Sequence, residues 1–188
     1  MMSDYTLAQT PFPLGSPAPD FNLKGVDGKM HSLDSYQHFS ILVIAAVCNH
    51  CPYVQAYLQR MIDLQSKYAH RGVTFVGINS NDEQIYPEDS FDHMVAMARE
   101  QGFNFDYLRD EDQAVAKAFH MERTPQFFVF DAERKLRYMG GLDNNYKDAA
   151  AVTEHPLEDA ILDLLEGREV QKQVAHFIGC SVKWRESL

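Results

Sequence analysis

A pair of cysteines directly behind an apolar segment constrains the fold of this 188-residue chain more than any other feature. The run Ile41–Val47 shows no polar alternation, which is typical of a strand that is covered on both faces. Cys48 and Cys51 follow at once, and Pro52 fits the first turn of a helix, where its missing N–H needs no partner. Two cysteines with this spacing at a strand-to-helix junction can close a small disulfide and open it again.

The same junction favours ionisation of a thiol. The start of a helix carries unpaired N–H donors and the positive end of the helix dipole, and both stabilise a thiolate. We therefore expect the first cysteine of the pair, Cys48, to be ionised more readily than a free cysteine. Because the thiolate is the nucleophile in thiol–disulfide exchange, this position predicts redox chemistry at the pair.

Hydrophobic periodicity predicts one α/β domain with a mixed central sheet flanked by helices on both faces. The expected elements are an N-terminal β-hairpin extension over 18–29, a strand at 41–47, a helix at 52–70, a strand at 73–78, helices at 90–101 and 111–119, a hairpin formed by 126–130 and 136–139, and a helix at 156–166. Residues 1–16 contain two prolines and a glycine, and we expect them to be a loosely ordered tail. Residues 17–188 are predicted to form the single domain.

Composition excludes some classes of partner. The net charge is −10, so neither nucleic acid nor an anionic membrane surface is expected to attract the chain. The N-terminus shows neither a basic segment nor a long apolar segment of the kind that starts a secretory signal. Three cysteines are too few for a disulfide-stapled scaffold, so we expect a cytoplasmic protein whose cysteine pair is catalytic or metal-binding.

A second motif, Thr124-Pro125, precedes the strand expected at 126–130. With the cysteine pair, it resembles the thioredoxin superfamily. The fuller pattern resembles the peroxiredoxin-like thioredoxin family proteins, which are grouped with the alkyl hydroperoxide reductase and thiol-specific antioxidant proteins. The segments that carry this resemblance are Ala18–Phe21, Asp27–Lys29, Cys48–Tyr53, Asn79–Asp82 and Gly179–Trp184.

The resemblance implies a thioredoxin-like fold in which Pro125 is a cis-proline facing the cysteine pair, beside backbone that pairs with an extended substrate segment. It also implies that Cys48 is the attacking thiolate and Cys51 the resolving thiol. The helix-end argument favours the same order, with Cys48 exposed and Cys51 deeper. The flanking candidates for binding substrate or tuning the redox potential are Asn49, His50, Pro52, Arg123 and Thr124.

Two positions depart from the thioredoxin pattern. Thioredoxins place a buried Asp six residues before the first cysteine and a Trp just before it, and this chain has Leu42 and Val47 there. His50 is then the nearest titratable group that could handle protons. The polar segment Asn79–Asp82, which follows the strand at 73–78, is expected to be a solvated turn.

The leading hypothesis is a thiol–disulfide oxidoreductase that acts on a protein or small-molecule disulfide, draws electrons from an upstream thiol donor and needs no bound organic cofactor. One alternative is a thiol peroxidase using Cys51 or Cys48. Peroxiredoxins have a Thr or Ser and a Pro upstream of their reactive cysteine. If Cys51 has that role, Cys48 stands at the position of the Thr and Ile44 at the position of the Pro. Of the usual accessory groups, only an arginine, Arg123, is then present. A second alternative is a metal carrier or redox sensor.

A metal site is not predicted, because structural zinc takes four ligands and the chain has no second closely spaced cysteine pair. The third cysteine, Cys180, is 129 residues beyond Cys51, so only the fold could bring the two together. Its simplest interpretation is a small buried hydrophobe, and the alternative is an auxiliary thiol.

Overall fold

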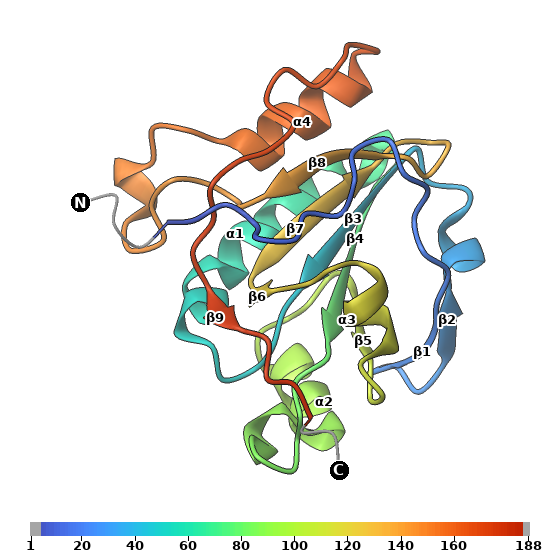
Figure 1. The fold of residues 1–188 in the computed structure, drawn as a ribbon, viewed down its shortest axis with the longest axis vertical. Helices are drawn as coiled ribbons and strands as arrows, with labels where there is room; N and C mark the ends of the chain where they lie inside the picture. The colour runs from blue at the N-terminus through green and yellow to red at the C-terminus, as the bar shows by residue number, and fades with distance from the viewer. Residues whose placement is uncertain (1–4, 186–188) are drawn as a thin grey trace.

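The computed structural model describes residues 5–185, and within them one mixed sheet forms the centre of the molecule (Figure 1). Its strands are β1 (Asn22–Gly25), β2 (Met30–Ser32), β3 (Ile41–Ala46), β4 (Val73–Asn79), β5 (Asp106–Arg109), β7 (Gln126–Phe130) and β8 (Leu136–Gly140). They lie in the order β2-β1-β5-β4-β3-β7-β8. Strands β3, β4 and β5 are parallel, and the remaining neighbours pair antiparallel.

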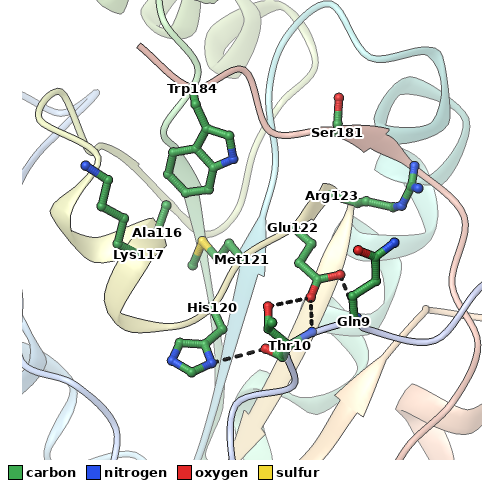
Figure 2. A pocket seen from close by; sticks show the side chains of 10 residues that line it. All are labelled: Gln9, Thr10, Ala116, Lys117, His120, Met121, Glu122, Arg123, Ser181 and Trp184. Atoms are coloured by element: carbon green, nitrogen blue, oxygen red, sulfur yellow. Dashed lines mark hydrogen bonds between the residues drawn. The ribbon is translucent and has the colours of Figure 1, made fainter. Parts of the chain in front are cut away.

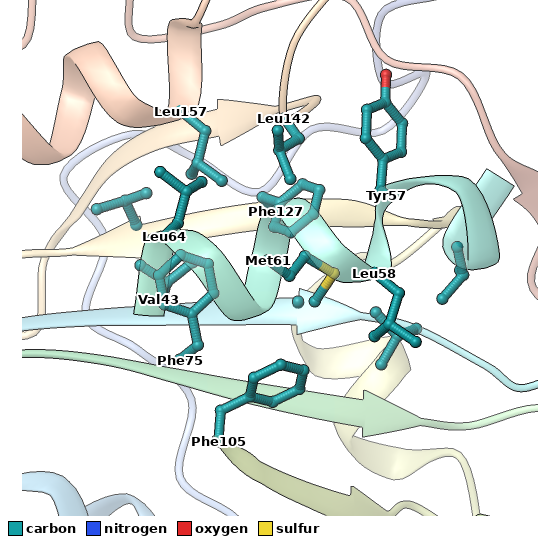
Figure 3. Close-up of a cluster of buried hydrophobic side chains, with 14 of the residues drawn as sticks. Val43, Tyr57, Leu58, Met61, Leu64, Phe75, Phe105, Phe127, Leu142 and Leu157 are labelled. Carbon is teal, nitrogen blue, oxygen red and sulfur yellow. The ribbon is translucent and has the colours of Figure 1, made fainter. Parts of the chain in front are cut away.

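Helices cover both faces of this sheet, which confirms the predicted fold class. They are α1 (Pro52–Tyr68), α2 (Phe91–Glu100), α3 (Ala114–Ala118) and α4 (Pro156–Leu165). Alternate residues of the fully buried β3 enter two separate cores, as expected of a strand covered on both sides. Side chains of α1 and α4 pack into one core (Figure 3), which also takes in Met94 and Ala98 of α2. Helix α3 packs into the other core with the segment that contains Phe12 and Phe21. Within residues 5–185, no helix combines the length and the apolarity that a membrane span requires.

The sequence analysis missed β5. Its signal was an alternation of aromatic residues at Phe103, Phe105 and Tyr107, and two of these side chains, Phe105 and Tyr107, are buried. Because β5 pairs with β4 on one side and with β1 on the other, it joins the N-terminal hairpin to the central sheet.

The prediction of a loosely ordered tail is wrong for residues 5–16. Thr6 exchanges two backbone hydrogen bonds with Phe177, each 2.9 Å long. The backbone N–H of Thr10 donates to the carboxylate of Glu122 at 2.6 Å. Prolines exclude a regular helix or central strand here, but they do not prevent an extended segment from pairing at separate points with the rest of the chain. The first four residues of the chain lie outside the described part.

Two short strands outside the main sheet position the site. Strand β6 (Arg123–Thr124) pairs antiparallel with β9 (Cys180–Ser181), and Thr124 lies opposite Cys180. The Thr124-Pro125 peptide bond is cis, as the resemblance implied. In Figure 1 the C-terminal segment crosses the molecule to reach β6 at the end of the sheet where α1 begins.

Candidate active site

The cysteine pair lies at the start of α1, but its geometry differs from the prediction. Cys51 is the N-cap residue and Pro52 is the first helical residue. Cys48 therefore lies before the helix, in the loop that follows β3. Both cysteine side chains are 0% exposed. The prediction that Cys48 is exposed at the helix end, with Cys51 deeper, is therefore wrong. The helix starts late because residues 49 and 50 form a bend and Cys51 has extended backbone.

One residue contacts both sulfur atoms of the pair. Cys48 Sγ lies 3.3 Å from Thr124 Oγ1, and Cys51 Sγ lies 3.1 Å from the carbonyl oxygen of Thr124. Thr124 immediately precedes cis-Pro125, so the fold brings together the two motifs that the sequence analysis singled out. Because the two thiols also hydrogen-bond with each other, their sulfurs are placed to form and break a disulfide.

The environment of Cys51 lowers its pKa to about 5. The largest cause is the hydrogen bond with the Cys48 thiol, and the Cys180 thiol and the backbone N–H of Val54 add to it, whereas burial opposes the shift. The carbonyl of Thr124 also opposes it, because an acceptor 3.1 Å from a thiolate repels it. The backbone N–H of Cys180 is a fourth donor, and the four donors outweigh this one acceptor. The N-cap position of Cys51 adds the positive end of the helix dipole.

The pKa of Cys48 is raised by the same hydrogen bond with Cys51, by burial, and by the negative charge of Asp89. Thr124 lowers it, because its hydroxyl can donate to the sulfur. The proton shared by the pair therefore stays on Cys48, and the negative charge is on Cys51. This distribution is the reverse of the one that we expected from the sequence.

Asp89 is a site residue that sequence reasoning missed. It closes a short 3-10 turn, Pro87–Asp89, and its carboxylate is fully buried. One oxygen accepts from the backbone N–H of Asn49 at 2.7 Å and of His50 at 3.3 Å. The other lies 2.5 Å from His50 Nδ1 and accepts from Asn81 Nδ2 at 2.8 Å. These bonds hold the bend between the cysteines, and α1 starts only after it.

The flanking residues predicted from the sequence lie around this carboxylate or beside β9. The Asn49 side chain is buried and accepts from the hydroxyl of Tyr107 at 2.8 Å. The His50 ring stacks on Tyr86 with ring centroids 4.7 Å apart. Arg123 reaches the C-terminal segment, where its Nη1 donates to the carbonyl of Gly179 at 2.9 Å.

The segment Asn79–Asp82 is buried, so the expectation of a solvated turn is wrong. Besides binding Asp89, its Asn81 side chain accepts from the backbone N–H of Lys183 at 2.8 Å. The N–H of Asp82 donates to the Lys183 carbonyl at 2.9 Å. The segment is polar because it connects the loop between the cysteines to the C-terminal segment.

Cys48, His50 and Asp89 each offer one ligand atom, and these three atoms lie within 4.8 Å of one another. Structural zinc takes four ligands, and no fourth His, Cys, Asp or Glu between residues 5 and 185 joins this group. Both oxygens of Asp89 are already hydrogen-bonded. The arrangement suits proton handling beside Cys48 better than metal binding.

Comparison with known proteins places this site in a family. A profile of the AhpC/TSA family matches residues 14–139, which include the cysteine pair, Asp89 and cis-Pro125. The chain belongs to the AhpC/TSA family. Within this family it is a thioredoxin-like, peroxiredoxin-like member, as the sequence motifs indicated.

Three proteins illustrate its similarity in sequence and structure to known proteins. An uncharacterized conserved protein from Geobacillus kaustophilus superimposes with a TM-score of 0.91 at 41% identity, over 98% of each chain. A thioredoxin-family thiol:disulfide interchange protein from Chlorobium tepidum TLS shares the fold, with a TM-score of 0.57 at 24% identity over 68% of this chain and 86% of that one. The thiol-disulfide oxidoreductase ResA of Geobacillus thermodenitrificans is 22% identical over 137 residues, covering 72% of this chain and 73% of ResA. These findings support thiol–disulfide oxidoreductase chemistry, and membership of the AhpC/TSA family also fits the peroxidase alternative.

Proposed function

We propose that this AhpC/TSA-family chain is a thiol–disulfide oxidoreductase in which Cys51 attacks and Cys48 resolves. The observation that carries the proposal is the convergence of both sulfurs on Thr124, with Cys51 at the helix N-cap. The lowered pKa of Cys51 agrees with its role as the attacking thiol. The substrate class is a disulfide in a protein or a small molecule, and an upstream thiol supplies the electrons. The low cysteine content supports a cytoplasmic setting for this cycle.

The reaction proceeds in two exchanges. The Cys51 thiolate attacks one sulfur of the substrate disulfide, whose S–S bond breaks and releases the other sulfur as a thiolate. Cys48 then loses its proton toward His50 and Asp89, whose ligand atoms lie within 4.8 Å of its sulfur, and attacks Cys51. The Cys48–Cys51 bond forms, the second substrate sulfur leaves, and two electrons have passed from the protein to the substrate. Two external thiols restore the reduced pair.

The decisive experiment is a redox titration of a Cys180→Ser variant, which leaves only the pair able to form an intramolecular disulfide. We expect one two-electron transition between dithiol and disulfide, together with catalytic reduction of insulin disulfides. The matched controls Cys48→Ser/Cys180→Ser and Cys51→Ser/Cys180→Ser are expected to lose the transition. A Cys180→Ser protein whose two thiols stay free across the whole range of potentials would refute the proposed function.

The position of Cys51 favours peroxidase activity as a second candidate function. A cysteine with a pKa of about 5, at a helix N-cap and followed by Pro52, is a competent nucleophile toward a peroxide oxygen. Such a reaction would convert the Cys51 thiolate to a sulfenic acid and the peroxide to an alcohol or water. Stopped-flow mixing of reduced protein with hydrogen peroxide measures it. A second-order rate constant no larger than that of free cysteine would remove this candidate.

A further inference from the structure

The chain's own C-terminal strand occupies the backbone edge beside cis-Pro125, where the resemblance placed an extended substrate segment. Thr124 pairs with Cys180, and Arg123 pairs with Ser181. The fit leaves no room for a side chain at Gly179, because a Cβ there would lie 2.5 Å from the carbonyl oxygen of Thr124. The backbone that the resemblance assigned to an extended substrate segment is therefore paired within the chain in the structure.

This pairing places a third thiol against the cysteine pair. Cys51 contacts the Thr124 carbonyl, Cys180 lies directly opposite Thr124, and the thiols of Cys51 and Cys180 are hydrogen-bonded to each other. Cys48 and Cys180 therefore both donate to the same sulfur atom. Of the three thiols, only Cys180 is partly exposed, because the two others are fully buried.

Several hydrogen bonds fix the strand in this place. The N–H of Val182 donates to the carbonyl of Glu122 at 2.9 Å. The carbonyl of Lys183 accepts from Asp82 N–H at 2.9 Å and from Gln113 Nε2 at 2.9 Å. These bonds hold the chain just after Cys180, and the bond from Arg123 Nη1 to the Gly179 carbonyl holds it just before, so the position of Cys180 beside Cys51 is fixed from both sides.

We propose that Cys180 is a third redox-active thiol, which exchanges with Cys48 as the disulfide partner of Cys51. This inference rests on the proposed function of the pair. In the exchange the Cys180 thiolate attacks Cys51 in the Cys48–Cys51 disulfide, the Cys51–Cys180 bond forms, and Cys48 leaves and takes up a proton. No net oxidation occurs. The disulfide has moved from Cys48–Cys51, in which both cysteines are buried, to Cys51–Cys180, in which Cys180 is partly exposed.

The accessible disulfide gives the electron donor a point of entry. An external thiolate attacks Cys180, the Cys51–Cys180 bond breaks, and Cys51 leaves as the thiolate, which is the favoured leaving group because its pKa is low. A second external thiol then releases Cys180 and carries away the external disulfide. Two electrons and two protons have entered, and the three thiols are restored.

The surface beside the ladder offers room for such a donor. A pocket of about 630 Å³ borders β6 and β9. Arg123 and Ser181, which are opposite each other in the ladder, line one side of it, and Trp184 faces them across the opening (Figure 2). Trp184 is the only tryptophan of the chain and is 41% exposed, so its fluorescence reports on movement of the C-terminal segment.

The test is disulfide mapping of the full-length Cys48→Ser variant after oxidation with diamide. We expect a single intramolecular Cys51–Cys180 disulfide by mass spectrometry without reduction, and no remaining thiol that reacts with iodoacetamide. The matched control Cys48→Ser/Cys180→Ser is expected to keep Cys51 reactive. Two free thiols in oxidised Cys48→Ser would overturn the inference, whereas the proposed function fails only if Cys180→Ser forms no Cys48–Cys51 disulfide.

A second measurement does not depend on the folding of that variant. Wild-type protein treated with less than one equivalent of diamide is expected to show both disulfides of Cys51. Reduction of the oxidised protein by glutathione is expected to be at least tenfold slower in Cys180→Ser, because only the buried disulfide remains. The rate should be unchanged in Ala151→Ser, at an exposed residue that does not line the pocket. Wild-type protein that contains only the Cys48–Cys51 disulfide, with an unchanged rate in Cys180→Ser, would contradict the inference.

Discussion

Replacing Cys51 with serine is expected to slow the reduction of insulin disulfides by at least about a thousandfold, which corresponds to about 4 kcal/mol of lost transition-state stabilisation. The reason is that Cys51 carries the negative charge of the pair, and a serine hydroxyl is not ionised at neutral pH. The Cys48→Ser/Cys180→Ser variant is expected to behave differently. It keeps the attacking thiolate but has no second thiol to resolve the product, so it should accumulate a mixed disulfide between Cys51 and the substrate, detectable by mass spectrometry. A mixed disulfide on Cys48 in the Cys51→Ser variant would show that the two roles are reversed.

The pH dependence of alkylation checks the same assignment without a substrate. Because the pKa of Cys51 is lowered, its thiolate is present above about pH 5 and is lost as the pH falls through that value. The rate at which iodoacetamide modifies Cys51 in the reduced protein should therefore have its midpoint near pH 5. In Cys48→Ala the strongest donor is missing, so the midpoint should rise, whereas Cys48→Ser keeps a donor and should stay closer to the wild-type value. A midpoint near the ordinary value of about 8.5 would contradict the assignment.

Replacing Asp89 with asparagine is expected to lower the free energy of unfolding by about 3 kcal/mol. Both carboxylate oxygens of Asp89 accept hydrogen bonds, so an NH₂ group in place of either oxygen would face donors such as Asn81 Nδ2 or the Asn49 N–H. Urea denaturation measures the loss. The matched control is Asp92→Asn at the exposed first turn of α2, which should cost only about 0.5 kcal/mol.

The same variant should also change the cysteines. The negative charge of Asp89 helps to raise the pKa of Cys48, so its removal should lower that pKa and make Cys48 easier to alkylate. A purely structural role would reduce stability without shifting the pH midpoint at Cys48. An Asp89→Asn protein as stable as wild type, with an unchanged Cys48 profile, would show that this carboxylate does not organise the site.

Local patterns were sufficient for much of this fold and for part of the site. The unbroken apolar run of β3, the helical spacing of α1 and the position of Pro52 each depend on residues close together in the chain, and each is found where the sequence predicts it. Strand β5 was missed although its aromatic alternation was visible, because the strand is short and lies between two predicted helices. The cis bond before Pro125 followed from resemblance to a family and not from the residues alone.

The distribution of charge over the cysteines depended on the tertiary structure. Asp89 reaches the pair from 38 residues beyond Cys51, and Cys180 reaches it from 129 residues beyond, through a two-residue ladder whose pairing the sequence did not predict. The sequence alone predicted that two thiols lie together at the start of a helix, because Cys48, Cys51 and Pro52 are within five residues of one another. Which thiol is ionised, and that a third lies beside it, depended on the path of the whole chain. Hydrogen bonds and buried charges act over a few ångströms of space, whatever the separation in sequence.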